Sequence, residues 1–423
     1  MDGAREQIKG ELKRELGVFG IEILQDFLDS KKEKLSESHI EELEDHLFEK
    51  IKKERGFEKA EEVVDRIKKI RLSKELEGLR EKSKSKIQYR SRYEVLKELG
   101  DVCLNLNQLS EAENYYEEML EISEEFDRKE MILESLKLEA ELYLIQDELS
   151  KVEENARRII DLSRKSSDRI LEGEGIKLAG IVAWRKGDNE EGKNYLNDAL
   201  EIFEEKGLKE DTAAIYRELG DLHVSVENYE RGVEYYEKAA DLFGEAEMFY
   251  ERANMLLEIG VILSERGNEE ALEYLKLVEQ ESMENCFFDF AGWSSLNLAE
   301  IYFEENSNQD AEEKARKALD LFKRVGDKHG EGGANLTLGR IIGVEGDLSE
   351  AERFLGEALN TFRRLELSES EAETLYRLAE VQKEMKKFDR AKTNLEEALK
   401  ISDSLDMTEM KEKIEGELAN LTK

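Results

Sequence analysis

The chain has 423 residues, of which 39% are charged, and it contains no proline. At ordinary usage roughly 20 prolines would be expected, so their absence favours nearly continuous helix with glycine and polar turns. The net charge is −37, and residues 1–90 contribute none of it because they hold 22 basic and 22 acidic side chains. Such an acidic surface repels nucleic acid and anionic membrane, so neither is an expected partner.

Two further features suggest where the protein works. The two cysteines, Cys103 and Cys286, cannot form a disulfide framework, which suits a reducing compartment. No charged-then-apolar leader opens the chain and no stretch approaches 18 apolar residues. We therefore expect a cytoplasmic protein.

The first part of the chain is interpreted as a separate helical unit. Apolar residues at helical spacing predict about three amphipathic helices within 1–72, a small domain that could mediate dimerisation, dock a partner or cap the remainder of the chain. The segment lacks a basic recognition helix, which argues against DNA binding. Residues 73–87 are a basic junction, and the wider stretch 66–92 holds eleven basic side chains. It is either a solvated helix that neutralises the acidic remainder or a tether for an acidic surface.

From residue 88 onward a small residue returns at an almost constant interval. Successive members are 40, 40, 40, 40, 39, 40 and 40 residues apart, which marks a repeat array. We call these positions the slots, and they are Gly100, Ala140, Gly180, Gly220, Gly260, Ala299, Gly339 and Ala379.

Each slot lies in an apolar helical pattern, and a polar turn and a second such pattern come after it. A second small residue usually stands twelve positions after the slot, as Gly232 does after Gly220. Small residues at matched positions let two helix backbones approach closely, and stacked hairpins then share one continuous core. The pattern predicts an all-α fold of about eight hairpins over 88–405, each with a helix A and a helix B. A last amphipathic helix, 406–423, is expected to cap the array.

These positions resemble the tetratricopeptide repeat, whose helix A carries Leu-Gly and whose helix B carries Ala, an aromatic or apolar residue, and Ala. Leu219-Gly220 with Gly232, Tyr236 and Ala239 fits that pattern. The resemblance implies a right-handed α-solenoid. The step of about 40 is similar to the longer-helix subclass of G-protein-regulator and kinesin-light-chain arrays. The family's proline after helix B is absent, and the second repeat, around Ala140, is degenerate.

The resemblance also implies that helices A line a concave groove for a protein or peptide partner. Residues three before the slot, one after it and four after it would face that groove. The position three before the slot is cationic in the first four repeats and apolar in the last four: Lys97, Lys137, Lys177, Arg217, Leu257, Leu296, Leu336 and Tyr376. The other groove candidates are Trp184, Val224, Val261, Phe303 and Arg340.

The cationic ladder has two interpretations. It could hold a carboxylate-bearing segment of a partner, or its members could form ordinary i,i+4 pairs such as Lys137 with Glu141. Lys177 faces Ile181 and lacks such a pair. If the ladder recognises a ligand, reversing the charges of Lys137 and Lys177 should weaken partner binding without unfolding the array.

No enzymatic chemistry stands out. His39, Glu42, His46 and Glu49 lack the spacing of a zinc helix, and the glycine-rich run 330–333 comes after no strand and lacks the lysine of a phosphate loop. We expect no metal, no cofactor and no catalytic site. The aromatic run 286–290 and Trp293 open the sixth repeat, where the phase slips by one residue. They either pack an irregular junction or form a small apolar pocket or hinge.

The sequence thus favours a non-enzymatic scaffold or adaptor that binds a peptide or helix in the groove. The alternative is a peptide-responsive regulatory sensor in which the array controls the helical domain 1–72. A third possibility is a subunit of an enzyme complex. Neither the partner nor the oligomeric state can be inferred from these residues.

Overall fold

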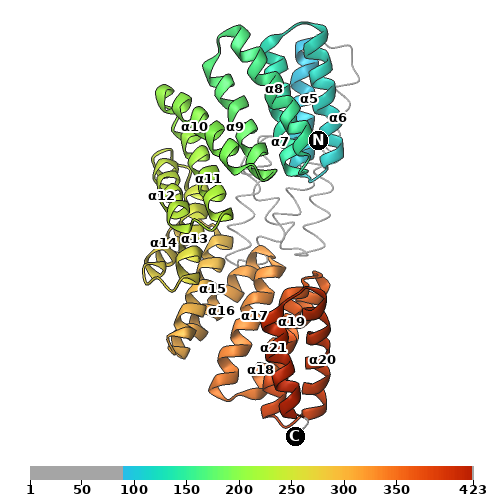
Figure 1. The fold of residues 1–423 in the computed structure, drawn as a ribbon, viewed down its shortest axis with the longest axis vertical. Coiled ribbons are helices and arrows are strands. Elements are labelled where there is room, and N and C mark those ends of the chain that lie inside the picture. Colours follow the sequence, from blue (N-terminus) through green and yellow to red (C-terminus); the bar gives the residue numbers. More distant parts are fainter. Residues whose placement is uncertain (1–88, 422–423) are drawn as a thin grey trace, which may run out of the picture. The chain divides into compact units, whose positions relative to one another are not determined.

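The computed structural model describes residues 89–421, which form α-helices and no strand (Figure 1). The helices A are α5 (Tyr89–Asn105), α7 (Lys129–Ile145), α9 (Arg169–Arg185), α11 (Lys209–Ser225), α13 (Phe249–Glu265), α15 (Phe288–Glu304), α17 (Lys328–Glu345) and α19 (Ser368–Glu384). The helices B are α6 (Leu109–Glu125), α8 (Leu149–Ser166), α10 (Asn189–Lys206), α12 (Tyr229–Glu245), α14 (Ala271–Glu284), α16 (Asn308–Val325), α18 (Leu348–Arg364) and α20 (Phe388–Ser404). A last helix, α21 (Thr408–Leu421), comes after the eighth hairpin.

Every slot lies on a helix A, so the expected all-α solenoid of helical hairpins is confirmed. The interpretations of residues 1–72, of the junction 73–87 and of the histidine and glutamate set 39–49 lie outside the described residues. Within 89–421, no helix is long and apolar enough to span a membrane.

The contacts divide the chain into two compact units between Leu242 and Phe243. In the first, successive helices pack side by side from α5 to α11. Its core contains large side chains with no solvent exposure, among them Tyr116, Met119 and Phe203. The degenerate second repeat is a regular hairpin here, because Val152 and Ala156 of α8 are buried against α7.

The second unit packs successive helices from α13 to α21. One apolar cluster runs from α15 to α21, and it includes the fully buried Ile414 of α21. Without α21 the apolar side of α20 would face water, so the last helix closes the core. The aromatic residues of the sixth repeat belong to the packing: Trp293 contacts Phe322 and His329, with ring centroids 4.9 and 5.3 Å apart.

The slots are small because a large helix B side chain lies against them. A Cβ atom built on Gly100 or on Gly220 would stand 2.2 Å from the ring of Tyr116 or 2.5 Å from that of Tyr236. Where the slot is alanine, the residue sixteen positions later is alanine in two of three cases, as in Ala140 with Ala156. The glycine slots therefore face tyrosine or leucine, whereas two of the three alanine slots face another alanine.

The turns explain how the helices end without proline. A residue in the left-handed region terminates the helices at intervals of about twenty residues, and eleven of these residues are not glycine. At the first turn Asn107 has φ 56°, and the amide of Gln108 donates to the carbonyl of Cys103 at 2.8 Å. This is a Schellman ending, and it connects one helix directly to the next.

Candidate functional site

The candidate site is the A-helix face, meaning the side of helices A that helices B leave uncovered. Adjacent helices A contact one another from α9 to α11 and from α13 through α15 and α17 to α19. The predicted groove positions, three residues before and one residue after each slot, therefore lie on helices of adjacent repeats that contact one another. Each of the two units has its own part of this face.

In the first unit the four predicted cations are all ion-paired. Lys97 donates to Glu134 on the next helix A, and Lys137 lies 3.8 Å from Glu174 on the helix after that. The sequence interpretation had paired these lysines along their own helices, but the structure pairs them between repeats. These bridges connect α5 with α7 and α7 with α9.

Lys177 also has a partner, although it lacks one at i,i+4. Its ammonium lies 2.7 Å from Glu174, the residue three positions earlier. Arg217 pairs with its neighbour Glu218 at 3.0 Å. The first-unit ladder is therefore part of an internal ionic network rather than a row of unpaired cations.

Glu174 is the centre of that network and is only 4% exposed. Burial alone would raise the pKa of its carboxyl, but Lys177 and Lys137 outweigh burial, so the pKa lies below its usual value. The pKa of the neighbouring Asp211 is raised by burial and by the charge of Glu174. Reversing both lysines would leave buried carboxylates without counter-charge, so the expectation that this change spares the fold does not suit the structure.

Trp184 and Val224 are only partly available on the face. Each packs over the small residue of its own helix B: a Cβ on Gly192 would meet Trp184, and one on Gly232 would meet Val224 at 2.6 Å. The indole nitrogen of Trp184 is buried and has no acceptor among the described residues. Both side chains thus help to hold helix A against helix B.

In the second unit the apolar ladder belongs largely to the core. Leu296, Leu336 and Tyr376 are each less than 10% exposed and pack in the cluster that runs to α21. Leu257 of α13 is buried to the same extent, and Val261 is half-buried. These residues hold the helices A together and present little surface to a ligand.

A cavity of about 320 Å³ opens among α15, α17, α18 and α19 in this unit. Phe303 and Arg340, two of the predicted groove residues, line it together with Arg377, Val344 and Val381. Val344 is 68% exposed. Apolar and cationic side chains therefore meet at one place on the A-helix face.

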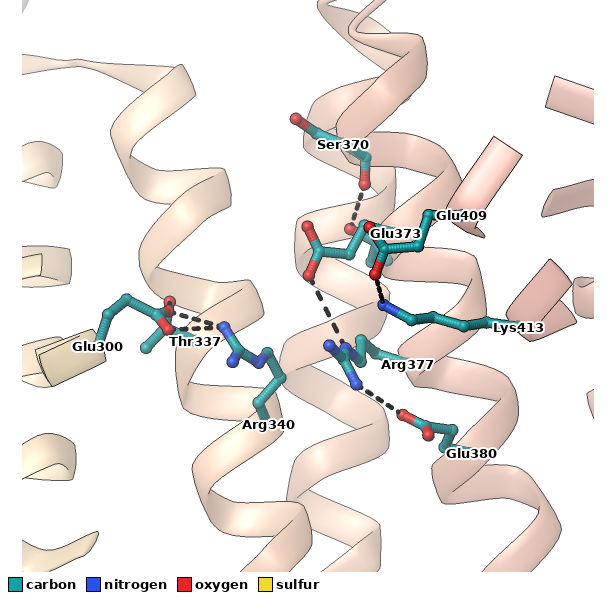
Figure 2. Close-up of polar contacts among 10 residues, drawn as sticks. Glu300, Thr337, Arg340, Ser370, Glu373, Arg377, Glu380, Glu409 and Lys413 are labelled. Carbon is teal, nitrogen blue, oxygen red and sulfur yellow. Dashed lines mark hydrogen bonds and ion pairs between the residues drawn. The ribbon is translucent and has the colours of Figure 1, made fainter. Parts of the chain in front are cut away.

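The two arginines of this cavity are held differently (Figure 2). Both oxygens of Glu300 accept from Arg340, at 2.9 and 2.7 Å, and Thr337 donates to the same carboxylate. Arg377 donates to Glu380 at 3.1 Å and lies 3.8 Å from Glu373. One nitrogen of Arg340, Nη1, thus donates to both oxygens of a single carboxylate, whereas Arg377 has two longer contacts to two different carboxylates.

Sequence reasoning found two members of this cavity and missed others. Arg377 stands two before its slot and Val344 five after, so neither occupies a position that was assigned to the groove. The position of Arg377 depends on how α17 and α19 pack, and the repeat pattern does not contain that information.

Comparison with known proteins supports the repeat assignment. Residues 176–245 and 332–404 match a family model described as tetratricopeptide repeat, and residues 93–126 match a second model with that description. No curated protein matches the chain.

The fold occurs in solved structures. A signal transduction ATPase with numerous domains that carries a tetratricopeptide repeat sensor, from Pyrococcus horikoshii, superposes with a TM-score of 0.60 at 17% identity. The match covers 85% of this chain and 55% of that protein, so the chain spans little more than half of its length.

Two bacterial structures are less similar. Aspartyl phosphate phosphatase F from Bacillus subtilis has a TM-score of 0.49 at 15% identity, covering 87% of this chain and 95% of that one. The apo quorum sensor NprR from B. thuringiensis has a TM-score of 0.45 at 16% identity, covering 78% and 97%. The chain therefore carries tetratricopeptide repeats within residues 93–126, 176–245 and 332–404, and its described helices stack as such repeats do.

Proposed function

We propose that this chain is a non-enzymatic scaffold that binds a short segment of a partner protein on the A-helix face of its second unit. The observation that carries the proposal is the 320 Å³ cavity, where Phe303 and Arg340 meet Arg377. A cavity of this size can accept a large side chain of a ligand. The first unit contributes less, because its four cations already have carboxylate partners.

The chemistry of the cavity indicates what the segment carries. An apolar side chain would pack against Phe303, Val344 and Val381, and a carboxylate beside it would replace Glu380 or Glu373 on Arg377. Arg377 is the recognition residue in this proposal, because its side chain is 34% exposed and its present partners are single contacts. Arg340 is a positioning residue that Glu300 holds over the ring of Phe303, 5.2 Å from its centroid.

The test is selection of peptides from a random displayed library on the immobilised full-length chain. We expect enrichment of segments that place an acidic residue next to a leucine, isoleucine or phenylalanine. Affinities of the selected peptides should fall about tenfold for Arg377→Ala and for Val344→Asp, since each removes one contact worth roughly 1.5 kcal/mol.

Arg353→Ala is the matched control. Arg353 lies on α18, a helix B, with two carboxylate partners, Glu350 and Glu357, and an aromatic neighbour, Phe354. Its substitution should leave peptide affinity unchanged. Peptides that lose affinity equally in the control, or that bind Arg377→Ala normally, would rule out the cavity as the binding site.

A regulatory sensor is the second candidate. The structural neighbour with the TM-score of 0.60 is described as carrying a tetratricopeptide repeat sensor, and a further segment, 1–88, precedes the repeats of this chain. The two roles differ in one measurable way. A sensor should change amide hydrogen exchange within residues 1–88 when a selected peptide binds, whereas a scaffold should not.

A further inference from the structure

A second cavity, of about 520 Å³, lies in the first unit between two helices B, α8 and α10, with α9 as its floor. Figure 1 shows where these three helices lie in the unit. None of the predicted groove residues lines it. Its walls along α8 extend from Glu153 to Arg164, which at 1.5 Å per residue is a length of about 16 Å. The cavity is therefore elongated along the helices.

The sequence of α9 explains why this cavity exists in the third repeat. Its floor contains Ala179 and Ala183, one position before and three positions after the slot. In the seventh repeat the equivalent residues are Leu338 and Ile342, which are almost fully buried. No other repeat has alanine at both positions, and Ala179 and Ala183 are partly exposed. The space that larger side chains occupy elsewhere is open here.

The basic groups of the cavity are already neutralised within the chain. Arg157 and Lys186 both pair with Glu153, and Arg164 pairs with Glu172 at 2.8 Å. The bases therefore have little charge to offer a ligand.

The acidic groups are not all neutralised. Asp161 on α8 and Asp198 on α10 line opposite walls, and neither has a cation partner among residues 89–421. The floor between them is apolar, from Ile176 and Val182 of α9, and Ile160 adds an apolar side chain to the α8 wall. The cavity thus combines an apolar floor with unpaired carboxylates on both sides.

We propose that this cavity is a second docking site, for an extended basic segment of a partner protein. At about 3.3 Å per residue, five extended residues cover the length of the cavity. Alternating side chains would then place an apolar group on the alanine floor and a lysine or arginine against Asp161 or Asp198. This site lies in another unit than the cavity at Arg377, between helices B, and it does not depend on the function proposed above.

The probe is a fluorescein-labelled pentapeptide of alternating lysine and leucine, titrated with the full-length chain at physiological ionic strength. The decisive variant is Ala179→Leu/Ala183→Ile, which copies the pair found in the seventh repeat and changes no charge. Filling the floor should weaken binding at least about tenfold, because the leucine side chains of the peptide can then no longer pack against it. The variant should retain the wild-type melting temperature or exceed it, which shows that the fold is intact.

A second variant tests the walls. Asp161→Asn/Asp198→Asn should weaken binding about threefold to tenfold, the range for two partly exposed ion pairs. Asp320→Asn is its control, because Asp320 has in the sixth repeat the position that Asp161 has in the second and does not line this cavity. The control should bind the pentapeptide as the wild type does.

Several results would overturn the proposal. Unchanged affinity of the filled variant would mean that the peptide is held only by the general acidity of the surface. Undetectable binding by the wild type would mean that the cavity is no docking site for such a segment. Equal binding of a glutamate–leucine pentapeptide would mean that the carboxylates do not select basic residues. Hexylamine should compete at least about tenfold more weakly than the peptide, and equal competition would assign the cavity to a small organic cation instead. Arg377→Ala should leave pentapeptide binding unchanged, which separates this site from the one proposed in the second unit.

Discussion

The A-helix faces of the two units use the same repeated backbone in different ways. In the first unit, charged side chains join neighbouring helices A through Glu174 and its lysines. In the second, leucines and Tyr376 join them, and arginines with carboxylate partners surround one cavity. The slots fix the spacing of the helices in both units, so the residue three positions earlier is free to be ionic or apolar. The repeat therefore determines the position of a residue on the A-helix face, but it does not determine whether that residue is charged or apolar.

Breaking the ionic network should give the largest loss of stability. Lys137→Glu/Lys177→Glu leaves the buried Glu174 facing new negative charge, and we expect the free energy of unfolding to fall by about 3–5 kcal/mol. Denaturant unfolding measured by circular dichroism tests this. Adding Glu174→Gln to the double variant should recover part of the loss. The comparison with the second unit is Arg340→Ala, whose partner Glu300 is more exposed, so about 1 kcal/mol is expected there. Equal losses in the two variants would contradict the distinction between the units.

Two buried glutamates, one in each unit, should make the stability of the chain depend on pH in opposite ways. Burial raises the pKa of Glu139 to about 7, although Asn155 donates to it and Arg158 lies nearby; Glu117 and Glu124 act in the same direction as burial. A carboxyl whose pKa is raised in the folded state stabilises the protein below its unfolded pKa, and that stability is lost as the pH rises to 7 and above. Glu139→Gln should therefore raise the free energy of unfolding at pH 8 by up to about 3 kcal/mol and have little effect at pH 4.

Glu279 in the second unit should behave in the opposite way. Burial would raise its pKa, but hydrogen bonds from Lys314, Ser295 and Lys317 outweigh burial and lower it. Its contribution to stability is present above the unfolded pKa and is lost as the pH falls through the lowered folded pKa. Glu279→Gln should consequently lower the melting temperature at pH 8 and have less effect at pH 3. If both glutamine variants shift stability in one direction at pH 8, the assigned environments are wrong.

Adding one methyl group at a slot should have an intermediate effect. Gly220→Ala places a Cβ about 2.5 Å from the ring of Tyr236, so we expect a loss of about 1–3 kcal/mol from overpacking. In a double-mutant cycle with Tyr236→Ala, the coupling energy should exceed about 1 kcal/mol, because the shortened side chain removes the clash. Purely additive effects would show that the two helices do not approach as closely as the structure has them.

The smallest expected change concerns the turns and should be alike in both units. Glu227 and Glu366 have φ values of 59° and 57°, where a side chain is unfavourable. Glu227→Gly and Glu366→Gly should each stabilise the chain by about 0.5–1 kcal/mol, as seen in thermal unfolding. Asn306→Gly is the control, and it should change stability less, because asparagine tolerates the left-handed region at its φ of 62°.

The sequence by itself determined the fold and the spacing of its parts. A small residue every forty positions can only serve a close approach of two helices, and Gly220 against Tyr236 shows that approach. The absence of proline likewise predicted long helices. These helices end at residues in the left-handed region instead of at a proline. These features are local or periodic, so they can be read from one chain.

Only the tertiary structure decided which surface residues meet. Lys97 pairs with Glu134 and Lys137 with Glu174, although both pairs are 37 residues apart in the chain. The same packing brings Arg377 to Phe303 and Arg340, and it leaves a cavity over Ala179 and Ala183. Each of these features depends on how neighbouring helices lie against one another. The repeat pattern fixes the order of the helices without fixing which side chains reach across.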